Sequence, residues 1–205
     1  DTLIVLFGDN RAALNITKKD FFPFSAQTVP SGGSVWDGSL NDPWIGEKGM
    51  LSEGGIRVPF LMRWKNHLPE GLVYKEPVIS IDASTTAAAI AGLSTGDLDG
   101  INLVPYLKDQ ALKPNRALYW RFMQQSAVRQ GKWKYLRTAD EGEYLFDLST
   151  DNHEKINLLT QHPAIAKTMH TQLSDWSATL KTPGLASGLL IGSDKYWYDF
   201  YFPKN

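Results

Sequence analysis

The stretch GEKGMLSEGGIRVP, residues 46–59, restricts the fold and function of this chain more than any other. It places Lys48, Glu53 and Arg57 around a glycine pair and ends on a proline, directly ahead of the apolar run FLM. A surface loop can be charged, and it can be glycine-rich. A loop that is both, and that leads straight into a core-like segment, favours a loop that holds a ligand.

The composition is that of a globular protein with one domain, or one domain and a small second one. The chain has 205 residues, of which 42% are hydrophobic and 21% charged, enough for a sizeable core. A net charge of −1 and a pI of about 6.5 argue against a nucleic-acid partner. No apolar run approaches the roughly 18–20 residues of a membrane span. Without cysteine, the chain forms no disulfide, thiolate zinc site or cysteine nucleophile.

The segment DTLIVLFGDN, residues 1–10, predicts a buried strand with polar groups at its end. Its apolar run, 3–7, favours a strand covered on both faces, as in a parallel sheet. Asp9 and Asn10 would lie at the carboxyl end of that strand, where open α/β sheets bind ligands. A carboxylate and an amide carbonyl suit Ca²⁺ or Mg²⁺ and suit zinc poorly. The alternative is an Asx turn that caps the strand.

The chain up to residue 116 has the pattern of an α/β arrangement. Residues 11–45 are irregular and rich in Gly, Ser, Pro and Asn, which indicates a long functional loop. The expected elements after it are a strand over 58–64, a strand over 73–81 with a bend at Pro77, a helix over 83–91 with Asp82 as N-cap and Gly92 as its stop, and a short packed turn near 103–107.

The chain after residue 116 has the pattern of a small antiparallel sheet with one helix. The expected elements are a strand over 118–123, a hairpin over 126–138 that turns at Gln130-Gly131, a strand over 144–148 and a helix over 163–180. Apolar residues at helical spacing, from Ile165 to Leu180, predict that this helix packs on the sheet. The aromatic tail, 196–202, is expected to be a strand or strap packed against the core.

The chemistry of the opening stretch depends on Lys48. An ammonium is a compact charge that can meet a tetrahedral oxyanion without a planar fork. Gly54 and Gly55 allow positive φ and close backbone approach, and Glu53 could pair with Arg57 to pin the loop. The alternative is a solvated loop with an incidental ion pair of little energetic value.

These motifs occur in an order that resembles the sulfatase family. FGDN and GEKGMLSEGGIRVP are similar to the family's Asp-Asn-Gly after a strand and its G-x-K-x-x-x-x-E-G-G-x-R-V-P. PVISIDASTTAAAIAGL resembles V-x-x-x-D-x-x-P-T-x-x-x-x-A-G, with Thr85 in the place of the proline, and DGINLVPYLKD resembles D-G-x-S-L-x-P-x-L. AVRQGKWKYLR and YLFDLSTDNHEKINLL are similar to A-V-R-x-G-x-W-K and L-Y-D-L-x-x-D-P-x-E-x-x-N-L. Together they cover most of residues 1–159.

The resemblance implies an α/β fold, the carboxyl-terminal part of an alkaline-phosphatase-like sulfatase. Residues 1–110 would belong to the catalytic domain, and 111–205 would form a small α+β subdomain of antiparallel sheet plus helix. The implied activity is that of an arylsulfatase-like sulfuric ester hydrolase.

The resemblance also assigns roles residue by residue. Asp9 and Asn10 match two metal ligands, for Ca²⁺ ahead of Mg²⁺. Lys48 matches the catalytic, substrate-binding lysine that contacts the sulfate group. Arg11 stands where a glycine usually follows Asp-Asn, and its long side chain could reach into the substrate cleft. The residues that match the support of the lysine are Glu53, Gly54, Gly55 and Arg57, and those with structural roles in the C-terminal sheet are Trp133 and Lys134.

The family's nucleophile, a formylglycine made from Cys or Ser in C/S-x-P-x-R, has no match in this chain. Thr28–Gly32 is the nearest lookalike, but it has Thr for the nucleophile and Gly for the Arg. We therefore expect formylglycine in a missing amino-terminal part of the same enzyme, and the isolated chain to be incomplete and inactive. The resemblance further implies a periplasmic or secreted enzyme whose partner is a sulfated small molecule or glycan.

Two other functions stay open from the sequence. A phosphodiesterase or phosphonate hydrolase of the same superfamily would hold phosphate with the same metal and lysine. A non-catalytic glycan-binding or structural remnant would fold alone, and Arg11 and the aromatic tail leave room for it. Hydrolysis rates on an aryl sulfate and on an aryl phosphate diester would distinguish a sulfatase from the phosphodiesterase or phosphonate hydrolase. Glycan binding that does not depend on a divalent metal would favour the non-catalytic remnant.

Overall fold

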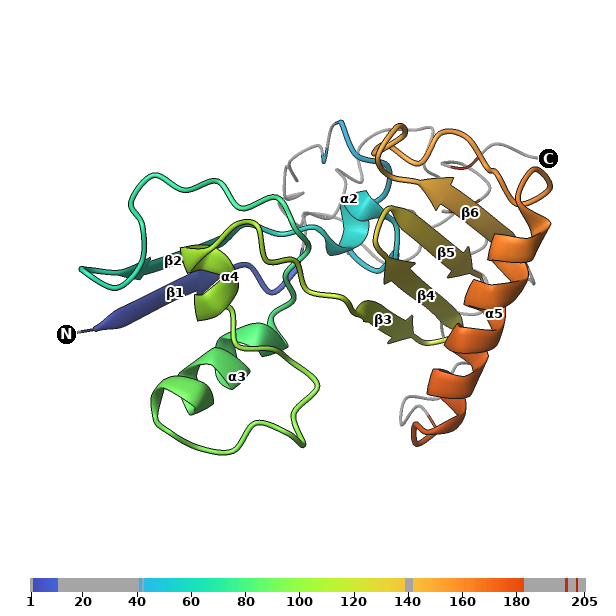
Figure 1. The fold of residues 1–205 in the computed structure, drawn as a ribbon. Coiled ribbons are helices and arrows are strands. Elements are labelled where there is room, and N and C mark those ends of the chain that lie inside the picture. Colours follow the sequence, from blue (N-terminus) through green and yellow to red (C-terminus); the bar gives the residue numbers. More distant parts are fainter. Residues whose placement is uncertain are drawn as a thin grey trace, which may run out of the picture. The chain divides into compact units, whose positions relative to one another are not determined.

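The computed structural model describes residues 2–10, 41, 43–138, 142–182, 198 and 202. The chain forms two compact units (Figure 1). The first unit comprises residues 1–9 and 58–116, and the second comprises residues 10–57 and 117–205. Both units combine helices with strands, which confirms the predicted α/β class. The division into domains at residue 110 stays a prediction.

Two antiparallel strands form the sheet of the first unit. They are β1 (Leu3–Phe7) and β2 (Phe60–Trp64), which pair over their full length. The N–H of Gly8 extends the ladder by donating to the carbonyl of Pro59 at 3.2 Å. The strands predicted over 3–7 and 58–64 are therefore confirmed in place.

The expected cover of β1 on both faces, as in a parallel sheet, is wrong for the described residues. β1 pairs with β2 in an antiparallel sheet of two strands. Ile4 and Leu6 are 52% and 59% exposed, because alternation along the strand turns both toward the same uncovered side.

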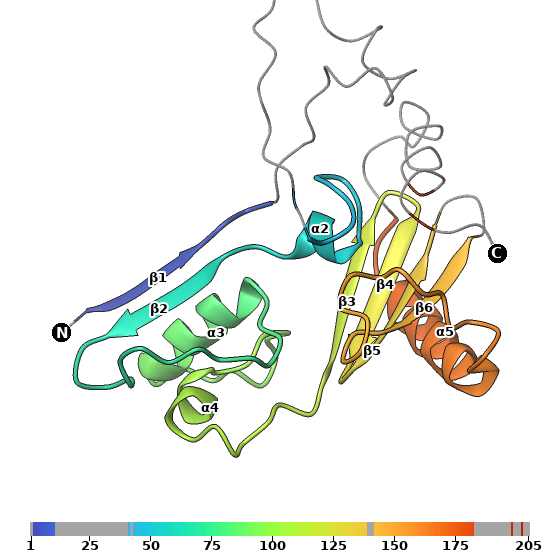
Figure 2. The ribbon, with the colours of Figure 1, turned by 90° about the horizontal axis from the view of Figure 1, so that it is seen from above.

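Two helices lie beside this ribbon, α3 (Ile81–Ile90) and α4 (Val104–Lys108) (Figure 2). The packed turn predicted near 103–107 is the start and body of α4, with Leu103 and Leu107 buried. None of the described helices has the length and apolar character that a bilayer crossing requires.

The prediction that Asp82 is the N-cap of α3 is wrong. Ser80 is the N-cap, and Asp82 lies within the first turn of the helix. Its buried carboxylate accepts hydrogen bonds from both terminal nitrogens of Arg116, each at 2.6 Å. It also accepts the N–H of Ile79 at 2.9 Å. The strand predicted over 73–81 is wrong, because Pro77 offers no N–H to a ladder and Asp82 takes that of Ile79.

The second unit contains the predicted antiparallel sheet. Its strands follow one another in chain order and are β3 (Ala117–Phe122), β4 (Gln125–Gln130), β5 (Trp133–Arg137) and β6 (Glu143–Asp147). Gln130 pairs with Trp133, so a two-residue turn joins β4 and β5. Gly131 there has φ +56°, as a tight hairpin requires.

Each face of this sheet packs against a different segment. α5 (Pro163–Ala178) covers one face and α2 (Glu53–Ile56) lies on the other side (Figure 2). The core under α5 consists of Val128, Tyr135, Leu145, Ala166, Met169 and Leu173. The core of the opposite face consists of Met50, Leu51, Ala127, Leu136, Phe146, Leu148, Tyr198 and Phe202. The predicted packing of the aromatic tail is thus confirmed for its two described residues.

Candidate functional site

The lysine loop, residues 45–51, presents Lys48 at an exposed turn. Gly46 and Gly49 have φ angles of +99° and +101°, a conformation that favours glycine. The N–H of Met50 donates to the carbonyl of Glu47 at 3.0 Å and closes the turn. The side chain of Lys48 is therefore open to solvent, while the backbone that carries it is constrained.

The glycine pair lies inside α2, where neither residue has room for a side chain. The N–H of Gly54 donates to the carbonyl of Ile45 at 2.7 Å, and a Cβ on Gly54 would meet that oxygen at 2.3 Å. A Cβ on Gly55 would meet the carbonyl oxygen of Met50 at 2.1 Å. Close backbone approach thus joins α2 to both ends of the lysine loop, which gives the predicted supporting role a physical basis.

A pair of cations on the sheet faces α2. Arg129 of β4 and Lys134 of β5 are direct cross-strand partners, an arrangement that destabilises a sheet unless an anion lies between them. Glu53, the first residue of α2, supplies that anion. Its Oε1 lies 3.0 Å from Lys134 Nζ and its Oε2 lies 3.5 Å from Arg129 Nη1. Glu53 is 3% exposed, so this contact ties α2 to the sheet beneath it.

Glu154, in the segment after β6, completes the cluster. Its Oε1 lies 2.8 Å from Lys134 Nζ, and its Oε2 accepts the backbone N–H of Glu53 at 2.6 Å. That N–H belongs to the first turn of α2, where a carboxylate satisfies a group that has no partner within the helix. Lys134 and Glu154 are both fully buried. One side chain thus binds both the helix start and the buried cation.

The charges of this cluster shift one another's pKa values. Burial acts to raise the pKa of Glu53, but the facing Lys134 and Arg129 hold it below its ordinary value. Burial acts to lower the pKa of Lys134, but Glu154 and Glu53 hold it above its ordinary value. Burial raises the pKa of Glu154, and the charge of Glu53 adds to that rise. Glu53 and Lys134 are therefore the firmly charged pair at neutral pH.

Arg57 lies at the end of α2 with half of its side chain exposed. Its Nη1 is 3.7 Å from Glu53 Oε2, as the predicted pairing of these residues required. Its guanidinium also lies 4.6 Å from the ring centroid of Trp44, within the range of a cation–π contact. Arg57 thus joins α2 to the chain that enters the lysine loop.

The predicted metal ligands, Asp9 and Asn10, are exposed residues that follow β1. Asp9 belongs to the first unit, and Asn10 and Lys48 belong to the second, so the convergence of Asp9 and Lys48 on one ion stays a prediction. In the described part of the chain, no three His, Cys, Asp or Glu side chains form a group that could hold a metal ion. Arg11 lies outside the described residues, as does nearly all of the predicted functional loop, 11–45.

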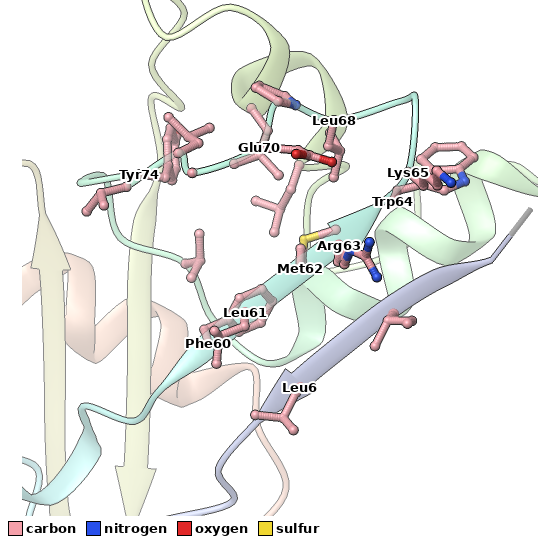
Figure 3. Close-up of a pocket in the computed structure, with 18 residues that line it drawn as sticks. Leu6, Phe60, Leu61, Met62, Arg63, Trp64, Lys65, Leu68, Glu70 and Tyr74 are labelled. Atoms are coloured by element: carbon pink, nitrogen blue, oxygen red, sulfur yellow. The ribbon is translucent and has the colours of Figure 1, made fainter.

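An apolar groove of about 720 Å³ lies in the first unit (Figure 3). Phe60, Met62 and Leu68 are among the side chains that line it, and Arg63 and Glu70 contribute charge. None of the predicted site residues lines it.

Sequence reasoning missed that Gln125 and Glu154 hold the lysine loop, and it gave Lys134 a structural role in the sheet without identifying its carboxylate partners. Lys134 carried a usable signal, because strand alternation places it on the same face as the buried Leu136. A lysine on an apolar face needs a carboxylate partner. Gln125 carried no such signal, whereas Glu154 is the glutamate of the quoted motif in YLFDLSTDNHEKINLL, although the motif does not identify its partners.

Comparisons with known proteins identify relatives of the whole arrangement. A family model described as "N-sulphoglucosamine sulphohydrolase, C-terminal" matches residues 43–179. Choline-sulfatase of Rhizobium meliloti (strain 1021) is 32% identical over 127 residues, which are 56% of this chain and 24% of that protein. Arylsulfatase A of Homo sapiens is 29% identical over 188 residues, which are 77% of this chain and 36% of that protein.

A solved structure extends the likeness to nearly the whole chain. The crystal structure of Ps i-CgsB matches this chain with a TM-score of 0.71 and 26% sequence identity. The match covers 97% of this chain and 40% of the Ps i-CgsB chain. The same protein has also been solved in complex with k-i-k-neocarrahexaose. This chain therefore spans well under half the length of each of these relatives.

Proposed function

Because the chain belongs to the sulfatase family, whose C-terminal region it matches over residues 43–179, we propose that it supplies Lys48 and part of a calcium site to an enzyme that hydrolyses sulfate esters. The proposal rests on one observation above the others. A buried charge cluster and two close-packed glycines hold a loop whose exposed side chain at the turn is an ammonium. A rigid loop with a single cation at its turn suits a tetrahedral oxyanion.

The role of Lys48 is to bind and orient the sulfate group. Its ammonium donates hydrogen bonds to a sulfate oxygen and offsets the negative charge that grows there as the ester bond breaks. A calcium ion held by the Asp9 carboxylate and the Asn10 carbonyl would supply further positive charge at the same anion. Both donors are hard oxygens, which this ion prefers.

The remaining parts of the reaction come from outside this sequence. We propose that the nucleophile is a formylglycine in an amino-terminal part of the same enzyme, and that the isolated chain is inactive. The substrate is a sulfated small molecule or glycan, with Arg11 as one of its contacts. The relatives that support these two classes are one named choline-sulfatase and one solved in complex with k-i-k-neocarrahexaose. We place the enzyme in the periplasm or outside the cell.

Hydrolysis rates of the enzyme that carries this chain test the proposal. We expect Lys48→Ala to lower kcat/KM for an aryl sulfate by about 100- to 1,000-fold, the usual effect of removing one stabiliser of transition-state charge. Lys155→Ala, a change of an exposed lysine after β6, is the matched control and should leave the rate unchanged. A faster rate on an aryl phosphate diester than on the sulfate would assign the site to phosphate chemistry instead.

A further inference from the structure

We propose that Gln125 and Tyr198 are positioning residues that fix Lys48 in place through the backbone of the lysine loop. The inference rests on the proposed function, because it concerns how the sulfate-binding lysine is held. Neither residue belongs to the motifs that carry the family resemblance. Together they form what we call the amide clamp.

Gln125 bonds to the loop on both sides of Met50. Its Nε2 donates to the carbonyl of Gly49 at 2.7 Å, one residue after Lys48. Its Oε1 accepts the N–H of Leu51 at 3.2 Å. The side chain is 1% exposed, so both groups would be buried without a partner if Gln125 were absent.

Tyr198, from the aromatic tail, fixes the orientation of this amide. Its hydroxyl donates to Gln125 Oε1 at 2.6 Å and accepts the N–H of Leu51 at 3.0 Å. The ring is 2% exposed and packs in the same core as Leu136 and Phe146. With Oε1 held by Tyr198, the Nε2 of Gln125 can point only toward the lysine loop.

The chain before Lys48 is held in a similar way. Asn41 Nδ2 donates to the carbonyl of Gly46 at 3.0 Å. The carbonyls of Gly46 and Gly49, which flank the turn, are thus each held by a buried amide side chain. Both glycines have positive φ, so the turn depends on these contacts to stay in one conformation.

The side-chain chemistry of residue 125 is therefore restricted. Glutamate can accept from Leu51 and Tyr198 but cannot donate to Gly49. Leucine has a similar size and makes none of the three bonds. Because Gln125 lies on β4, whose neighbours are both strands of the sheet, the clamp transfers the rigidity of the sheet to the turn of Lys48. A displacement of about 1 Å at such a group can cost about 100-fold in rate.

The test uses Gln125→Leu, Gln125→Glu and Tyr198→Phe in the enzyme that carries this chain. We expect kcat/KM for an aryl sulfate to fall about 10- to 100-fold for Gln125→Leu, with smaller losses for the other two. The amides of residues 46–51 should exchange with deuterium faster in each variant. Asn157→Leu is the matched control, because its half-buried amide accepts the N–H of Leu145 and donates to the carbonyl of Glu143, away from the lysine loop.

Two further results separate positioning from a purely structural role. In a Lys48→Ala background, Gln125→Leu should cost no further activity, since the group that it positions is gone. A kcat/KM for Gln125→Leu equal to that of Asn157→Leu, or unchanged exchange of residues 46–51, would overturn the inference. A failure of the proposed function is distinguishable, because Lys48→Ala would then leave sulfate hydrolysis intact while the exchange result still reports on the clamp.

Discussion

Lys134→Met removes the one side chain, among the residues that the structure describes, that contacts both buried carboxylates of the cluster. Methionine has nearly the length of lysine, so the change deletes a charge and leaves little cavity. Lys134 Nζ lies 3.0 Å from Glu53 and 2.8 Å from Glu154, and all three side chains are almost fully buried. Without it, two carboxylates face each other across a space that water does not reach.

The cost follows from what each carboxylate retains. Removing one partner of a buried ion pair costs about 3–5 kcal/mol. Glu53 keeps Arg129 at 3.5 Å and Arg57 at 3.7 Å, whereas Glu154 keeps its bond to the N–H of Glu53. We therefore expect a loss of about 3 kcal/mol, the lower end of this range, with most of it arising at Glu154.

The assay is urea unfolding followed by tryptophan fluorescence at several pH values. Burial already raises the pKa of Glu154, and removing the charge of Lys134, which acts to lower it, raises that pKa further in the Met variant. A carboxyl whose folded pKa is raised gains stability as the pH falls through that pKa. The loss should thus shrink as the pH falls toward the pKa of an unfolded glutamate, about 4.3. Adding Glu154→Gln to Lys134→Met should recover most of the loss.

Lys132→Met is the matched control for this series. Lys132 Nζ lies 2.6 Å from Asp147 Oδ2, but the lysine side chain is 52% exposed, so the change should cost less than about 1 kcal/mol. Equal losses for Lys132→Met and Lys134→Met, or a loss for Lys134→Met that does not depend on pH, would refute the reasoning.

Two further changes test the packing and the electrostatics of the second unit. Gly54→Ala should abolish most sulfate hydrolysis and destabilise the chain, because its Cβ would lie 2.3 Å from the carbonyl oxygen of Ile45. Gly96→Ala is the control, because a Cβ at Gly96 would meet no atom within 4 Å. It should change neither the hydrolysis rate nor the thermal melting temperature. Asp147→Asn should flatten the fall of stability below about pH 4. The hydrogen bonds from Lys132 and Ser149 lower the pKa of Asp147, so its stabilising effect is present above the unfolded pKa and is lost as the pH falls through the folded one. An unchanged pH profile of urea unfolding would contradict this assignment.

Local patterns predicted the second unit well. The hairpin at Gln130-Gly131 follows from a glycine between two alternating segments, and α5 follows from apolar spacing behind a proline. Each of these signals lies within a few residues of the element that it specifies. The packing of Tyr198 was also predictable, because a dense run of aromatic residues has few stable places outside a core.

Long-range contacts set the limit of sequence reasoning. Asp82 looked like a helix cap because its partner, Arg116, is 34 residues away and no local pattern links them. The same holds for Glu53 and Glu154, which are 101 residues apart. The exposure of Ile4 was missed because an apolar run predicts burial without saying what covers it. The motif of the lysine loop and the supporting role of Glu53 could be predicted, but the contacts from distant segments, through Gln125 and Glu154, could not.

The most direct test of the account is a crystal structure of the enzyme that carries this chain, grown with calcium and soaked with sulfate. We expect one calcium ion at about 2.3–2.6 Å from oxygens of Asp9 and Asn10. We also expect one oxygen of the sulfate that faces the calcium to lie within about 3.2 Å of Lys48 Nζ. Calcium bound elsewhere, or a sulfate that reaches the metal while Lys48 points away from it, would contradict the account.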